Sequence, residues 1–164
     1  MRRPTLSRPL FLACVFAGAA APAAGDPVRA GLADDAACAA TEVHGSTVRA
    51  GSFKGAITPE YDVLDGRFRL RVGGYRESER GLSQKIPWLV SRRVPVGTRL
   101  RIEGKRISPL PARTFRMTLA RTTGSRDHQH WFFPSIIKPP AEGCWRLQFT
   151  SGRTSGTLVV LVRG

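Results

Sequence analysis

Lysine and acidic residues are scarce in this chain. Its 164 residues include 22 arginines but only 4 lysines, 6 aspartates and 6 glutamates, which gives a formal net charge of +14. The length excludes a large multidomain enzyme, and the 41% of hydrophobic residues excludes a disordered tail or a collagen-like repeat. The composition therefore predicts one modest, strongly basic globular domain.

The motifs of the common catalytic classes are also missing. The chain has no G-x-S-x-G, P-loop, H-E-x-x-H or G-x-G-x-x-G pattern. Residues 135–138 match the S-x-x-K pattern of penicillin-interacting enzymes, but that chemistry needs the serine at the start of a helix. Here two β-branched residues and two prolines predict a strand that ends in a turn. We therefore expect a protein that is not an enzyme and that binds no cofactor.

Long hydrophobic runs are confined to the N-terminal region, where the pattern is that of a cleaved signal peptide. Three arginines among the first eight residues precede an apolar or small-residue stretch over 10–24, followed by small-x-small cleavage sites. This stretch falls short of the roughly 20 residues that a spanning helix needs, and no later run is longer. We expect residues 1–25 to be removed and the product to be exported to the periplasm or the extracellular space, with no transmembrane span.

A lipoprotein signal is the alternative for the same segment. Phe11-Leu12-Ala13-Cys14 loosely matches a lipoprotein cleavage site, in which Cys14 would carry the lipid. The apolar stretch before Cys14 is shorter than the usual minimum of about seven residues, and the apolar run continues beyond the cysteine. These two features favour an unmodified cysteine inside a discarded signal.

Two cysteines, Cys38 and Cys144, remain in the expected mature chain. An exported chain meets an oxidising compartment, where a pair of thiols usually closes into a disulfide. A metal-thiolate pair or two unrelated buried thiols are the alternatives, but no C-x-x-C or Cys-His spacing supports a metal. The sequence therefore favours a disulfide between Cys38 and Cys144.

Strand patterns recur from residue 38 onward, and helical periodicity is absent. Residues 61–64 and 68–72 flank Asp65-Gly66, a pair typical of a type I′ hairpin turn. Pro87 demotes the run 82–90 to an edge or bulged strand. Further strands are expected at 99–103, 115–119, 131–137, 145–149 and 157–162, and the last run, apolar on both faces, should be central or covered.

Seven or eight short strands separated by turns predict an all-β fold, an immunoglobulin-like β-sandwich over residues 38–164. Residues 26–37, which are small, polar and acidic, predict a flexible tether. The expected core residues are Trp88, Leu100, Ile102, Phe115, Met117, Leu147, Phe149, Leu158 and Val160.

Four blocks of this domain carry a resemblance to a known group. The blocks 85–88 (KIPW), 100–107 (LRIEGKRI), 134–135 (PS) and 143–147 (GCWRL) resemble those of exported bacterial proteins of unknown function with a C-terminal Gly-Cys-Trp strand. The resemblance implies an immunoglobulin-like sandwich with its two cysteines bridged, and no catalytic residues. The chain departs from the group by its many arginines and its His-Gln-His segment, which leaves a shared ligand open.

Two sets of residues are candidates for binding. Arg67, Arg69 and Arg71 alternate with apolar residues and should line one solvent face, where guanidinium groups can bind phosphates. The alternative is that the arginines reflect the nucleotide bias of a GC-rich genome, which favours arginine on any solvated face. The spread of the other arginines along the chain, with no single run, supports this alternative. His128 and His130 would share a face of a strand and could bind Zn²⁺ or Cu²⁺, with His44 or Asp127 completing the site, or they lie in an exposed loop.

These features predict a non-catalytic exported binding or structural module of the cell envelope. Its partner would be an anionic envelope polymer or another envelope protein, and no recognition fold for specific nucleic-acid binding is present. The alternative function is that of a periplasmic metal-binding protein that uses the His-x-His site.

Overall fold

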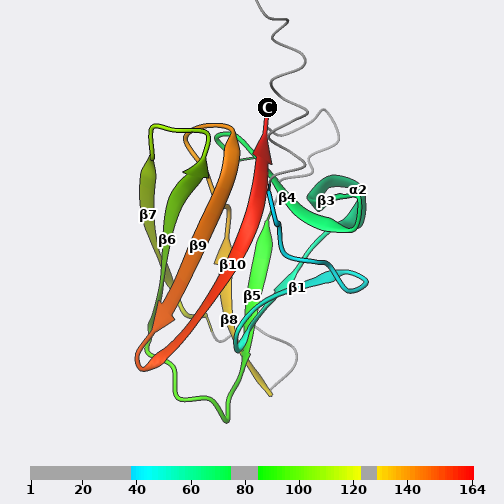
Figure 1. The fold of residues 1–164 in the computed structure, drawn as a ribbon. Coiled ribbons are helices and arrows are strands. Elements are labelled where there is room, and N and C mark those ends of the chain that lie inside the picture. Colours follow the sequence, from blue (N-terminus) through cyan, green and yellow to red (C-terminus); the bar gives the residue numbers. More distant parts are fainter. Residues whose placement is uncertain (1–37, 75–84, 123–128) are drawn as a thin grey trace, which may run out of the picture.

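The chain folds into two packed β-sheets (Figure 1). The computed structural model describes residues 38–74, 85–122 and 129–164; the predicted signal peptide, the predicted tether and Cys14 lie outside these ranges. One sheet has the strand order β1-β2-β5-β8 and the other β3-β4-β10-β9-β6-β7. The expectation of an all-β fold is confirmed, with ten strands in the described ranges instead of seven or eight.

The strands are short, and one turn of helix interrupts them. Their bounds are β1 Thr47–Ala50, β2 Phe53–Ala56, α2 Pro59–Asp62, β3 Val63–Leu64, β4 Arg67–Arg71, β5 Ile86–Ser91, β6 Arg99–Ser108, β7 Thr114–Ala120, β8 His130–Ser135, β9 Gly143–Ser151 and β10 Thr154–Arg163. Neighbouring strands pair antiparallel except β10 and β4, which run parallel.

The core lies between the sheets and is built from the inward positions of alternating strands. Trp88 of β5 packs on Phe149 of β9, with ring centroids 4.5 Å apart, and Phe53 lies 5.8 Å from the same ring. The indole N–H of Trp88 donates to the hydroxyl of Ser135 at 3.0 Å, and this hydroxyl donates to the carbonyl of Ile86 at 2.8 Å. Ser135 of the S-x-x-K pattern is therefore a buried strand residue with both hydrogen bonds satisfied.

Seven of the nine expected core residues are fully buried: Trp88, Leu100, Ile102, Leu147, Phe149, Leu158 and Val160. The expectation was wrong for Phe115 and Met117, which are only half-buried. Both residues lie on β7, the edge strand of the six-stranded sheet, so no neighbouring strand covers the free edge beside them.

Two details of the expected strands also differ from the structure. Pro87 lies in β5, which is an interior strand between β2 and β8. It is tolerated there because it lies beyond the last β2 pair, Gly55 with Trp88, and because its partner across β8 is Pro134, which also lacks an N–H. The expected strand at 61–64 begins as the helical turn α2, so only Val63–Leu64 is extended.

The predicted Asp-Gly turn between β3 and β4 is confirmed. Asp65 has φ of 51° and Gly66 has φ of 73°, so both central residues are left-handed as a type I′ turn requires. The hairpin of β1 and β2 was not foreseen, because its eight strand residues include three alanines or glycines and carry little strand signal.

Candidate anion-binding face

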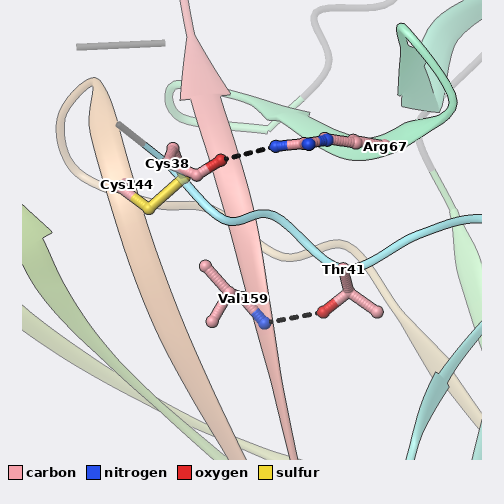
Figure 2. Close-up of a disulfide and its surroundings, with 5 residues drawn as sticks. All are labelled: Cys38, Thr41, Arg67, Cys144 and Val159. Carbon is pink, nitrogen blue, oxygen red and sulfur yellow. Dashed lines mark hydrogen bonds between the residues drawn. A yellow bond between two sulfur atoms is a disulfide. The ribbon is translucent and has the colours of Figure 1, made fainter. Parts of the chain in front are cut away.

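The described part of the chain begins at Cys38, which is joined to Cys144 at the start of β9 (Figure 2). The two Cα atoms are 5.5 Å apart, so the predicted disulfide is confirmed. Cys38 and Ala40 form a small buried cluster with Cys144 and Leu161 on the outside of the six-stranded sheet. This cluster covers the outer side of β10, as expected for a strand that is apolar on both faces.

Hydrogen bonds hold the segment after Cys38 against β10 and β4. Thr41 donates its N–H to the carbonyl of Val159, and Val159 donates its N–H back to the hydroxyl of Thr41, both at 2.9 Å. Phe68 donates its N–H to the carbonyl of Thr41 at 2.9 Å. The segment thus crosses the outer side of β10 and then lies beside the backbone edge of β10, next to β4 (Figure 2).

The three arginines predicted to line a solvent face do so, on the outer side of β4. Arg67 and Arg71 are exposed, Arg69 is half-buried, and Phe68 and Leu70 between them are buried in the core. Arg67 also has a structural role, since its guanidinium donates to the carbonyl of Cys38 at 3.2 Å (Figure 2). Arg163 of β10 lies next to Arg71 in the parallel register and extends this group.

A second group of cations lies on the outer side of β9, β6 and β7, which are neighbours in the sheet. We call it the basic face; its members are all exposed and are Arg99, Arg101 and Lys105 of β6, Arg116 of β7 and Arg146 of β9. Lys105 and Arg146 are directly paired across β6 and β9, so their charges lie side by side. The sequence pattern does not reveal that these cations are neighbours, because their strands are distant in the sequence and only the sheet order brings them together.

Glu103 is the one acidic residue at the outward positions of the five strands β4, β6, β7, β9 and β10. Its carboxylate accepts from Arg116 at 2.8 Å and lies 3.9 Å from Arg101. Nine cations occupy outward positions of the same strands. One carboxylate therefore neutralises a small part of the charge, and the outer face is strongly positive.

The basic face contains a shallow hollow of about 630 Å³. Charged and amide groups line it from three strands: Glu103 and Lys105 of β6, Arg116 of β7, and Arg146 and Gln148 of β9. A smaller hollow of about 340 Å³ lies further along the same strands and is lined by Arg99 and Arg101. Both hollows therefore open among the cations of the basic face, and Phe115 adds apolar lining to the larger one.

The opposite outer face carries far fewer cations. On the four-stranded sheet, Arg49 of β1 and Lys54 of β2 are paired across the hairpin, and the outward positions of β5 and β8 carry no lysine or arginine. The charge of the described residues is therefore distributed unevenly between the two sheets.

The predicted metal site is only partly within the described residues. His130 begins β8 and lines a hollow with Arg92 and Arg93, whereas Asp127 and His128 lie outside the described ranges. His44 lies before β1, where its carbonyl accepts from the hydroxyl of Thr47 at 3.0 Å. Among the described residues, no group of three or more metal-ligating side chains occurs.

Two further observations concern the compartment. A disulfide fits the oxidising environment outside the cytosol. Within the ranges that the structure covers, none of the helices has the length and apolar character needed to cross a bilayer.

The comparisons with known proteins add no relative. No protein-family model matches the chain, and neither a curated protein nor a solved structure matches it.

Proposed function

We propose that this protein is a non-catalytic exported binding module that holds an anionic partner of the cell envelope on the outer face of its six-stranded sheet. The observation that carries the proposal is the uneven charge: nine cations and one carboxylate lie at the outward positions of five strands. The expected binding residues were Arg67, Arg69 and Arg71, whereas the proposed binding site is centred on the basic face. The reason is that the guanidinium of Arg67 already donates a hydrogen bond to the carbonyl of Cys38.

The spacing of the cations favours a partner with many anionic groups. Adjacent strands lie about 4.8 Å apart, and residues two apart on one strand lie about 6.7 Å apart. Neighbouring cations of the basic face therefore stand on a grid of several ångströms, too wide for one small anion to contact them all. A polymer or a surface that repeats phosphate or sulfate groups can contact several at once.

We also propose that the sandwich is of immunoglobulin-like type. Its support is the order β10-β9-β6-β7 in one sheet and the pairing of β5 with β8 in the other, which correspond to strands G-F-C-C′ and B-E of that fold. The disulfide differs from the inter-sheet bridge of antibody domains, because Cys38 precedes the first strand. Residues 26–37 would then precede this domain as a flexible N-terminal tether of the mature chain.

Binding to immobilised heparin and to polyphosphate tests the proposed function. The double variant Lys105→Gln/Arg146→Gln removes two adjacent charges of the basic face, and Arg49→Gln/Lys54→Gln removes two adjacent charges of the opposite sheet. With about 1 kcal/mol for each cation near an anionic surface, the first variant should bind roughly 30-fold more weakly. The control variant should bind nearly as the wild type does, and added salt should weaken all binding.

Two results would contradict this proposal. If both double variants lose the same affinity, net charge alone drives the binding and the basic face has no special role. If the binding of the wild type is unaffected by salt, the interaction is not electrostatic.

The metal-binding alternative stays a prediction for His128 and His130. Calorimetric titration with Zn²⁺ and Cu²⁺ tests it: heat that disappears in His128→Ala supports the site, and the absence of heat in the wild type removes it.

A further inference from the structure

We propose that the protein docks on an anionic lipid bilayer through one end of the sandwich, with the β6–β7 loop inserted among the headgroups. The inference rests on the proposed function and specifies the anionic partner as a lipid surface. The loop spans residues 109–113 and lies at the end where β6 stops and β9 begins (Figure 1).

The exposed large hydrophobic side chains of the described residues lie in this loop and at the end of β6 that leads into it. Leu110 is 80% exposed, and Ile107, at the base of the loop, is 39% exposed. A single exposed apolar residue is ordinary on a protein surface, but here Ile107 near the end of β6 lies three positions from Leu110 in the loop, while the other large hydrophobic side chains of the described ranges are at least partly buried. The loop therefore offers apolar surface that its own fold leaves uncovered.

A buried arginine holds the loop in shape. Arg106 is 8% exposed and points inward from β6; its guanidinium donates to the carbonyl of Pro111 at 2.7 Å and to that of Glu142 at 3.2 Å. The N–H of Arg106 also donates to the carbonyl of Arg113 at 2.8 Å. These bonds tie Pro111 and Arg113, in the second half of the loop, to β6, so that Leu110 is presented from a fixed support.

Several cations lie at the same end of the six-stranded sheet as this apolar tip. Lys105 and Arg146 of the basic face lie two pairs before the last β6–β9 pair, Ser108 with Cys144, and Arg113 lies at the C-terminal end of the loop. Arg71 and Arg163, paired in the parallel register, end their strands at the same end of the sheet, which Figure 1 shows at the tip of β10. The carboxylate of Glu142, also at this end, accepts the N–H of Gly164 at 2.7 Å.

An exposed apolar tip with cations on the strands of the same sheet is the chemistry of an interface that is apolar inside and anionic at its surface. Acidic headgroups attract the cations, and the acyl region below them accepts the leucine. A soluble polyanion supplies the charge but no hydrocarbon for Leu110 and Ile107. A lipid surface therefore uses both features of this end, whereas a polymer uses one.

Sedimentation with phosphatidylcholine vesicles, with and without phosphatidylglycerol, tests the inference beside the heparin assay. The wild type should bind the vesicles that contain phosphatidylglycerol and should not bind vesicles of phosphatidylcholine alone. Leu110→Ser should bind them about tenfold more weakly, because it removes most of one leucine side chain from the acyl region, while its heparin binding stays unchanged. Lys105→Gln/Arg146→Gln should weaken both kinds of binding. A Leu110→Trp variant should show a blue shift of its emission with anionic vesicles alone.

The outcomes separate the two proposals. If the wild type binds heparin but not anionic vesicles, or if Leu110→Ser binds vesicles as the wild type does, the lipid inference is wrong and the proposed function survives. If the wild type binds neither, the proposed function is wrong as well. Unfolding curves of Leu110→Ser should match those of the wild type, because the residue is exposed, and this excludes misfolding as the cause.

Discussion

Removal of the disulfide gives the sharpest test of the energetics of this fold. The double variant Cys38→Ala/Cys144→Ala frees two positions that are 106 residues apart, a separation that spans most of the described domain. Chain-entropy arithmetic for a closed loop of this size gives about 4.7 kcal/mol of stabilisation. Because small domains have free energies of unfolding of about 5–15 kcal/mol, the variant should lose a large share of its stability.

The folded structure should nevertheless persist in this variant. Thr41 keeps its hydrogen bonds to Val159 and Phe68, so the segment after Cys38 stays attached to the sheet without the bridge. Most of the loss then arises from the greater freedom of the unfolded chain.

Urea denaturation followed by the fluorescence of the buried tryptophans measures the effect. The double variant should unfold at a much lower urea concentration, and the wild type treated with a reductant should behave in the same way. A loss below about 1 kcal/mol in both samples would refute the reasoning, because it would mean that closing this long loop restricts the unfolded chain very little.

Two core positions provide further predictions. Ser135→Ala should lower the free energy of unfolding by about 1–3 kcal/mol, because it leaves the indole N–H of Trp88 buried without an acceptor; a melt unchanged from the wild type would contradict that bond. Gly156→Ala should cost about 1–3 kcal/mol or more in the same urea assay, because its Cβ would overlap the backbone carbonyl of Ala50, and the exposed neighbour Ser155→Ala should cost little; equal effects of the two would argue against the close approach.

The local pattern of the chain predicted the strands well where alternation was regular. Leu147 and Phe149 alternate with polar neighbours and face the core, and Asp65-Gly66 forms the expected turn. The half-buried state of Phe115 could not be predicted, because a period of two residues assigns a side chain to a face and says nothing of whether its strand is central or at an edge. The prediction of an edge or bulged strand at Pro87 was wrong for the same reason, because the local pattern does not show which strands lie on either side of β5.

At the candidate site, the local pattern likewise predicts which way a side chain points but not which strands are its neighbours. The sequence by itself determined that arginines such as Arg101 and Arg146 point outward, since each alternates with buried residues on its own strand. It also determined the cysteine pair, because only two cysteines follow the expected signal. These properties depend on neighbours within a few positions and on composition.

Only the tertiary structure decided which outward residues are neighbours. Lys105 and Arg146 are 41 positions apart in the sequence, and they lie side by side because β6 pairs with β9. Likewise, Arg106 reads as one more basic residue in its strand, yet the structure buries it beneath the loop that carries Leu110. Strand order follows from the packing of the whole core, so the charge of a sheet face emerges only when the chain is folded.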